Sequence, residues 1–252
     1  MEFTINRDVF LKSLSHAHGI IEKKTTLPIL SNILLEVKNS KIKITATDLD
    51  IIYSEEVNLE KLDKEGSTTT SASILYDILR KLEPNSEVVL SLQSENKLKL
   101  TSGNSKFNLL CISSDNFPLS ESEENIKTQS YEISSQKFLK LLNKTKIAIS
   151  NDETRHYLNG IYLHKTNLQD KVFLCGVATD SHRLSSSSIE IDPNIEFEPI
   201  ILPRKTIFQL IYLLEQNTSD VKISSNKAKI KFEIENSILI SKVIDGRFPD
   251  YT

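Results

Sequence analysis

"FTINRDVFLKSL" at residues 3–14 and "YEISSQKFLKLL" at residues 131–142 are two versions of one stretch, 128 residues apart. In both, an aromatic residue opens a short alternating segment of the kind that forms a strand. Seven residues after that aromatic, "FLKSL" or "FLKLL" has the apolar spacing of an amphipathic helix. The repeated strand and helix indicate that one structural unit occurs twice in the chain.

Three further pairs of landmarks support the duplication and keep the same order along the chain. They are "LPILSNILLEV" at 27–37 with "RHYLNGIYLHK" at 155–165, "ATD" at 46–48 with "ATD" at 178–180, and "NFP" at 116–118 with "RFP" at 247–249. A chain of 252 residues is long enough for two domains. We therefore predict domains at 1–121 and 130–252, joined by a polar linker at 122–129.

Each unit is predicted to contain two amphipathic helices and a set of period-2 strands, which is an α+β domain with two helices packed on an antiparallel sheet. The helices are expected at 7–17, 73–82, 135–147 and 203–214. Ser71 or Ser73 is a candidate cap for the second helix, and Pro203 is suited to the start of the fourth.

The composition excludes several functional classes. The chain is 38% hydrophobic and 26% charged, as in ordinary globular proteins. Its apolar runs are far shorter than the roughly 18 residues of a membrane span, and "MEFTINRD" lacks the features of a secretory signal. The glycines form no phosphate-binding motif, and the cysteines and histidines show no metal-binding spacing. We expect a cytoplasmic protein without membrane association, metal or cofactor.

The net charge of −3 conceals a segregation of charge along the chain. The four predicted helices contain ten Lys or Arg residues against only Asp8 and Asp77, so they carry +8 and the rest carries −11. Basic residues are also good helix formers on solvated faces, which is the simpler explanation for any one helix. The same bias in all four helices favours a polyanion-binding side that contacts phosphates without reading sequence.

The stretch "ATDSHRL" at 178–184 places an acid, a hydroxyl, a histidine and an arginine side by side, as in the catalytic sites of hydrolases. Consecutive residues of a strand point to opposite faces, so Asp180, Ser181 and His182 cannot converge as a catalytic triad does. We therefore predict no catalytic residues. An esterase or peptidase remains the alternative, and loss of a hydrolytic activity in Ser181→Ala would support it.

Several motifs together resemble the bacterial sliding clamp family, the β subunit of DNA polymerase III. They are "TLPILSNILLEV" at 26–37, "ATDLD" at 46–50, "RHYLNG" at 155–160, "VATDSHRL" at 177–184 and "DGRFPDY" at 245–251. The resemblance covers Met1 to Tyr251. It implies the DNA-clamp fold and a non-catalytic processivity factor. Such a factor encircles duplex DNA as a ring-shaped dimer, without sequence specificity.

The resemblance also implies two sets of functional residues. A peptide pocket in the second domain, which captures short motifs of the polymerase α subunit, the clamp loader, other polymerases and repair proteins, would be formed by Arg155, Tyr157, Leu158, Thr179, Ser181, His182, Arg183, Leu184 and Pro249. Leu158, Leu184 and Pro249 would form its apolar floor. Contacts with double-stranded DNA are predicted for Lys24, Arg80, Lys140, Lys144 and Lys205, any of which could instead be merely solvated.

Two departures from the family pattern qualify these expectations. Ser181 stands where the family commonly has Gly, and the chain stops at Thr252, where the family's third domain would begin. We interpret the chain as a fragment that is monomeric and binds clamp-binding peptides weakly, whereas the full-length protein would be a homodimer. Two-domain clamps that close as trimers are one alternative. A protein-interaction scaffold without a DNA role, which would tolerate neutralisation of Lys140 and Lys144, is another.

Overall fold

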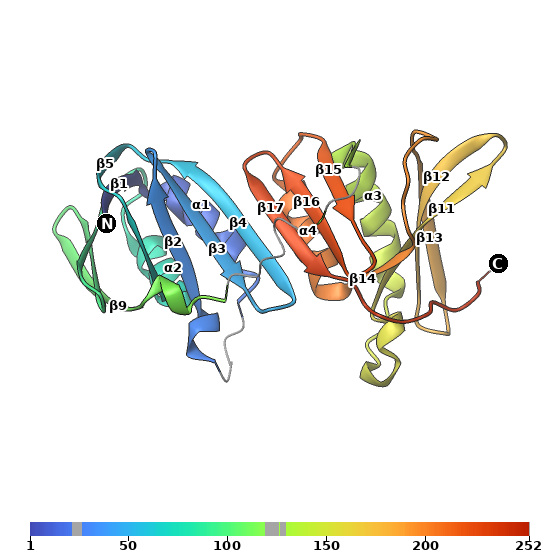
Figure 1. The fold of residues 1–252 in the computed structure, drawn as a ribbon, viewed down its shortest axis with the longest axis horizontal. Coiled ribbons are helices and arrows are strands. Elements are labelled where there is room, and N and C mark those ends of the chain that lie inside the picture. Colours follow the sequence, from blue (N-terminus) through green and yellow to red (C-terminus); the bar gives the residue numbers. More distant parts are fainter. Residues whose placement is uncertain (22–26, 119–125, 127–129, 252) are drawn as a thin grey trace. The chain divides into compact units, whose positions relative to one another are not determined.

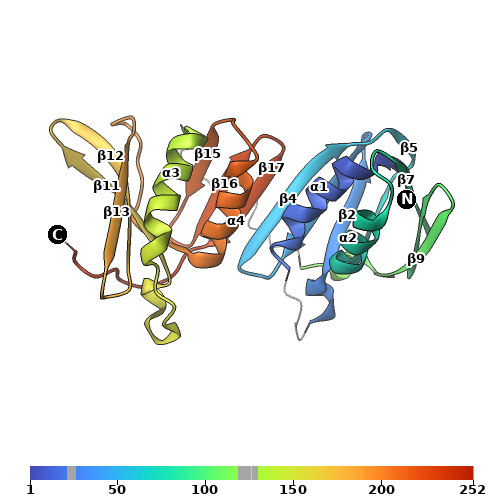
Figure 2. The same ribbon diagram turned by 180° about the vertical axis from the view of Figure 1, so that it is seen from behind.

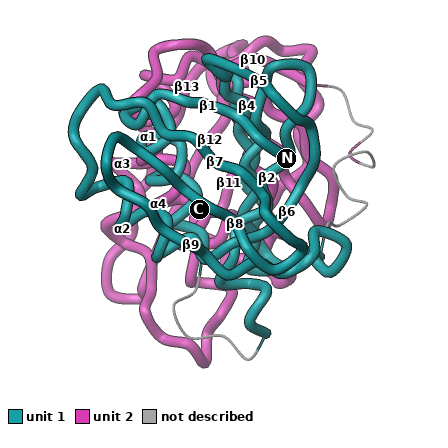
Figure 3. Tube along the Cα trace, turned by 90° about the vertical axis from the view of Figure 1, so that its left-hand side faces the viewer, with its two compact units in different colours: residues 1–120, 236–238 teal, residues 121–235, 239–252 magenta. Residues whose placement is uncertain are grey.

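The computed structural model describes residues 1–21, 27–118, 126 and 130–251. They form two compact units, one of residues 1–120 with 236–238 and one of residues 121–235 with 239–252 (Figure 3). Each unit combines two α-helices with antiparallel strands, so the predicted α+β class is confirmed. The predicted linker lies outside the described residues except for Ile126.

The described residues of unit 1 form nine strands in the order β4-β3-β2-β6-β9-β8-β7-β1-β5. Figure 1 shows β2, β3 and β4 side by side. The strands are β1 (Glu2–Asn6), β2 (Asn32–Lys38), β3 (Lys41–Thr47), β4 (Ile51–Asn58), β5 (Lys61–Lys64), β6 (Gly66–Ser71), β7 (Glu87–Ser94), β8 (Lys97–Ser102) and β9 (Ser105–Ile112). The helices are α1 (Arg7–His18) and α2 (Ala72–Lys81), with 3-10 turns η1 (Pro28–Ser31) and η2 (Ser114–Asn116).

Unit 2 repeats this plan, and its described strands follow one another in the orders β10-β15-β16-β17 and β13-β12-β11-β14. The strands are β10 (Tyr131–Ile133), β11 (Gly160–Leu168), β12 (Lys171–Thr179), β13 (Leu184–Glu190), β14 (Ile200–Pro203), β15 (Val221–Ser225), β16 (Lys229–Ile234) and β17 (Ser237–Lys242). The helices are α3 (Ser135–Thr145) and α4 (Arg204–Glu215), with 3-10 segments η4 (Lys146–Ala148) and η5 (Glu153–Leu158).

Helix starts follow from local chemistry. The Asn6 side chain accepts hydrogen bonds from the backbone N–H groups of Asp8 and Val9 at 2.9 and 3.4 Å, which caps α1. Ser71 caps α2 by accepting from the N–H of Ile74 at 3.4 Å, so of the two predicted serines Ser71 is the cap. Pro203 lies one residue before α4, where its missing N–H costs no helical hydrogen bond.

Within each unit the two helices lie side by side against the strands, and Figure 2 shows them from the helix side. In unit 2, Phe138 of α3 packs against Phe232 of β16, and both rings are fully buried. Gly176 of β12 lets α3 approach closely, because a Cβ atom there would lie 2.5 Å from Leu141 Cδ2. Burial of these large rings contributes strongly to the stability of the unit. It also fixes which face of α3 remains exposed.

Candidate functional site

The exposed face of α3 is basic. Lys137, Lys140 and Lys144 are exposed, and their spacing of three and four residues places them along one side of the helix. Phe138, Leu141 and Leu142 occupy the buried side. The structure therefore presents the predicted phosphate contacts Lys140 and Lys144 as neighbours on one surface.

Helix α4 begins with two cations, Arg204 and Lys205, which are both partly exposed. A cation in the first turn is unfavourable for the helix itself, because the positive end of the helix dipole lies there. Helix stability therefore does not explain these residues. Lys205, a predicted DNA contact, lies on the helix that packs beside α3.

In unit 1, Arg80 is exposed at the end of α2 and forms an ion pair with Asp77 across 3.4 Å. Both side chains are about 60% exposed, so the pair contributes little and leaves the guanidinium in reach of another anion. Arg7, another cation of the predicted helices, makes contacts within the unit. Its guanidinium donates to the carbonyl oxygens of Leu79 and Arg80 at 2.6 and 2.9 Å and joins α1 to the end of α2. Lys24 lies outside the described residues.

The second candidate surface is built around the turn between β12 and β13. The carboxylate Oδ1 of Asp180 accepts from the backbone N–H groups of His182 and Arg183, each at 3.0 Å. Oδ2 accepts from the Arg183 guanidinium at 2.9 Å. These hydrogen bonds, the backbone ones first, hold the pKa of Asp180 below its usual range. The carboxylate of Asp180 therefore stabilises the turn itself.

This geometry corrects the reason for excluding a catalytic triad. Asp180, Ser181 and His182 lie in a turn and not in a strand. The Asp180 oxygens are occupied by the two N–H groups and Arg183, and a triad would need that carboxylate for the imidazole. Ser181 adopts φ 77°, a left-handed conformation that glycine adopts at lower cost.

Segment η5 is attached to this turn by Arg155. Its Nη1 donates to Ser181 Oγ at 2.7 Å, and its Nε donates to Asp152 Oδ2 at 2.8 Å. Hydrogen bonds from Thr154 and then Arg155 keep the pKa of Asp152 low. Asp152 was not among the predicted site residues, although its position three residues before Arg155 was the available signal. The carboxylate of Asp152 fixes the Arg155 guanidinium beside the turn.

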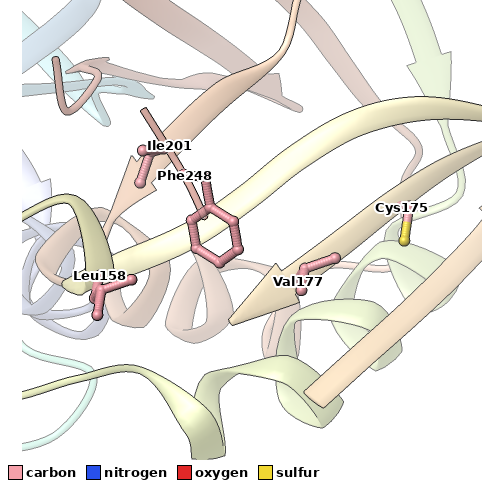
Figure 4. Packing of buried hydrophobic residues seen from close by; sticks show 5 residues of the cluster. All are labelled: Leu158, Cys175, Val177, Ile201 and Phe248. Atoms are coloured by element: carbon pink, nitrogen blue, oxygen red, sulfur yellow. The ribbon is translucent and has the colours of Figure 1, made fainter. Parts of the chain in front are cut away.

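Beneath these polar groups lies a compact apolar cluster. Leu158 packs with Cys175, Val177, Ile201 and Phe248, all of which are at most 8% exposed (Figure 4). Tyr157 is partly buried and packs against the same cluster. Phe248, which was also not predicted, precedes Pro249 and fixes where that proline emerges.

The predicted apolar floor is only partly buried. Leu158 is 2% exposed, whereas Leu184 is 48% exposed at the start of β13 and Pro249 is also exposed. Thr179 ends β12 and donates through Oγ1 to the carbonyl of Arg183 at 2.8 Å. The imidazole of His182 is exposed at the tip of the turn. Leu184 and Pro249 therefore present accessible apolar surface, whereas Leu158 belongs to the buried cluster.

Comparisons with known proteins identify the family. Residues 1–121 match the DNA polymerase III beta subunit, N-terminal domain, and residues 132–250 match its central domain. The chain is a member of this family. All of it aligns with the beta sliding clamp of Caulobacter vibrioides at 37% identity and covers 67% of that protein. The chain thus spans about two thirds of the length of such relatives.

Solved sliding clamps have the same fold. The beta sliding clamp of C. crescentus matches all of this chain with a TM-score of 0.95 at 37% identity, over 66% of its own length. The DNA polymerase III subunit beta of Bartonella birtlesii, bound to griselimycin, matches with a TM-score of 0.93 at 38% identity, over 67% of its length. The predicted clamp fold is confirmed.

Membership in this family also settles the question of catalysis. The DNA polymerase III β subunit is a non-catalytic processivity subunit, so the prediction that this sliding clamp chain is not an enzyme is confirmed. Among the described residues, no helix has the length and apolar character to cross a membrane. Across the same described ranges, no group of three or more His, Cys, Asp or Glu side chains is arranged to hold a metal.

Proposed function

We propose that this clamp chain belongs to a ring-forming processivity factor that encircles duplex DNA without sequence specificity and tethers its partners through unit 2. The observation that carries the DNA-binding part is the lysine-rich exposed face of α3, beside a helix that opens with two cations. Lysines on flexible stems suit weak, exchangeable phosphate contacts. A closed ring would retain DNA by topology, so no individual contact need be tight.

The domain boundaries, oligomer and partners of this proposal follow the family. The predicted domains 1–121 and 130–252 would be two of its clamp domains, and the full-length protein would close as a dimer. The DNA polymerase III α subunit, the clamp loader, other polymerases and repair proteins would bind by short motifs, and the protein would act in the cytoplasm. Lys24, Arg80, Lys140, Lys144 and Lys205 stay the proposed DNA contacts.

A salt titration tests the DNA-binding part. Lys140→Gln combined with Lys144→Gln should weaken binding of a duplex oligonucleotide and reduce the slope of log K against log salt by about 1.8, since each lost phosphate contact removes about 0.9. Lys97→Gln with Lys106→Gln is the matched control, because these lysines are exposed on strands and the net charge changes equally. Equal losses in both pairs would reduce the proposal to a general charge effect.

The peptide-binding part of the proposal rests on unit 2. There, Arg155 donates a hydrogen bond to Ser181, and Leu184 and Pro249 present apolar surface. Such surfaces, with a few fixed polar groups, suit short peptide anchors. The proposed site keeps all the predicted residues, namely Arg155, Tyr157, Leu158, Thr179, Ser181, His182, Arg183, Leu184 and Pro249.

Griselimycin is the ligand for testing this proposal, because the Bartonella clamp has been seen bound to it. Leu184→Ala should weaken griselimycin binding roughly tenfold by calorimetry, as expected for loss of an apolar anchor. Leu168→Ala is the control, since Leu168 is 62% exposed at the end of β11 and is no part of the proposed site. Unchanged affinity in Leu184→Ala would contradict the assignment.

A further inference from the structure

Helix α4 presents aromatic rings where a purely phosphate-binding helix would present cations. Within its twelve residues, all of which the structure describes, the exposed side chains are Phe208, Tyr212 and Glu215. Phe208 is 44% and Tyr212 38% exposed, and their spacing of four residues places them on one side of the helix. The charge pattern of the sequence predicts phosphate contacts alone and does not reveal these rings.

Two cations lie over the ring of Phe208. The Arg204 guanidinium carbon lies 5.4 Å and the Lys146 ammonium nitrogen 5.9 Å from the ring centroid. Both are within the range of cation–π attraction. A nucleotide joins an anionic phosphate to a flat base, so a partly exposed ring with two cations close to it is complementary to it in both respects.

The repeat supplies an internal comparison for this arrangement. Lys146 and Phe208 follow His18 and Tyr76 of unit 1 at spacings of 128 and 132 residues, as the sequence landmarks do. In unit 1 the imidazole of His18 stacks on Tyr76 with centroids 5.0 Å apart and planes inclined by 25°, and Tyr76 is only partly exposed. The ring in unit 1 is therefore stacked on a second ring, whereas the contacts over the ring in unit 2 are with cations.

From this contrast we infer that Phe208, with Arg204 and Lys146, forms a stacking site for an unpaired base of single-stranded DNA. The inference rests on the proposed DNA-binding function and adds a preference to it. Bases in a duplex are already stacked on each other, so an aromatic side chain gains most from a single strand. Lys140 and Lys144 on the neighbouring helix would hold the adjoining phosphates.

The absence of tryptophan from the sequence allows a direct test. Phe208→Trp and Tyr76→Trp each give the 252-residue chain a single indole, and stacking with a base quenches indole fluorescence. At low salt, an oligothymidine should quench Trp fluorescence in the Phe208→Trp chain more than a duplex of equal length does. The matched Tyr76→Trp chain should show no such difference.

Anisotropy of labelled oligonucleotides separates this inference from the proposed function. Phe208→Ala should weaken oligothymidine binding by about fivefold, near the lower end for loss of one stacked base, and leave duplex binding nearly unchanged. Phe208→Leu keeps apolar area without the ring and should be weakened likewise. If oligothymidine binds without quenching, or Phe208→Leu binds it as well as wild type, the stacking site is wrong while DNA binding stands. If neither oligonucleotide binds the wild-type chain, both proposals fail.

Discussion

The turn after β3 in unit 1 and the turn after β12 in unit 2 have the same internal hydrogen bonds. Thr47 and Thr179 donate through Oγ1 to the carbonyl four residues later, at 2.9 and 2.8 Å. Asp48 accepts from two backbone N–H groups at 3.0 and 2.7 Å, as Asp180 does at 3.0 Å. The shared "ATD" therefore builds the turn, and its aspartates need no binding role to explain them.

The two turns differ in what surrounds this shared frame. The left-handed position is Leu49 in unit 1 and Ser181 in unit 2, with φ of 78° and 77°. Ser181 accepts a hydrogen bond from Arg155, whereas Leu27, which corresponds to Arg155 in the repeat, is 50% exposed. In a duplicated protein, the residues that both copies share maintain the fold. The residues that differ are the better candidates for binding.

The largest expected effect comes from the leucine that each repeat buries in a 3-10 segment, Leu30 in η1 and Leu158 in η5. Leu158→Ala should destabilise unit 2 by about 3 kcal/mol and Leu30→Ala should destabilise unit 1 by about 2 kcal/mol, since each leaves a cavity and Leu30 is the less buried. Urea unfolding with hydrogen exchange can assign each loss to its unit. Only Leu158→Ala should weaken griselimycin binding, and equal weakening by Leu30→Ala would break the distinction between the repeats.

Replacement of the aspartates in the two turns is expected to give the next largest effect. Asp48→Ala should destabilise unit 1 by about 2 kcal/mol, because two backbone N–H groups lose their acceptor. Asp180→Ala should lower the thermal midpoint of unit 2 for the same reason. Asp48→Asn and Asp180→Asn are the controls, since an amide oxygen still accepts both bonds and asparagine suits such turns. A destabilised asparagine variant would mean that charge matters more than turn geometry.

Acid should act on the two units through different carboxylates. Burial alone would raise the pKa of Glu55, but hydrogen bonds from His16 and Tyr53 hold it below its ordinary value of 4.5. The pKa of Asp180 is likewise below 3.8. Each group stabilises its unit fully above these ordinary values, and the contribution is lost as pH falls through the lower folded-state pKa.

Unfolding free energies measured between pH 7 and pH 3 check this pH dependence. Glu55→Gln should flatten the acid slope for unit 1 and Asp180→Asn the slope for unit 2, whatever each does to stability at neutral pH. Hydrogen exchange reports the two units separately. A slope that persists unchanged in both variants would count against these carboxylates as the source of acid sensitivity.

The smallest expected effect distinguishes the two left-handed positions. Leu49→Gly should stabilise unit 1 by about 0.5 kcal/mol, because relief of the left-handed conformation outweighs the added freedom of the unfolded chain. Ser181→Gly should gain less, since it also removes the hydrogen bond from Arg155. Thermal midpoints of the two variants test this order. A larger gain in Ser181→Gly would show that the Arg155 contact contributes nothing.

Much of the fold could be predicted from the sequence, because strand alternation, apolar helix spacing and the repeat all report on local burial. Contacts between side chains that are distant in the sequence could not be predicted in this way. Val9 belongs to the apolar residues of the first helix but is 44% exposed, and Arg7, one of the ten helix cations, hydrogen-bonds to α2. The Arg155 contact with Ser181 joins residues 26 apart, which no periodicity reveals.

The bond from Arg7 to the end of α2 also affects how this unit meets a polyanion. The last carbonyl oxygens of a helix carry a negative partial charge that repels phosphate groups. Arg7 covers two of them, on Leu79 and Arg80. Arg7 can thus change the local potential without contacting a polyanion itself, because it neutralises the negative end of α2.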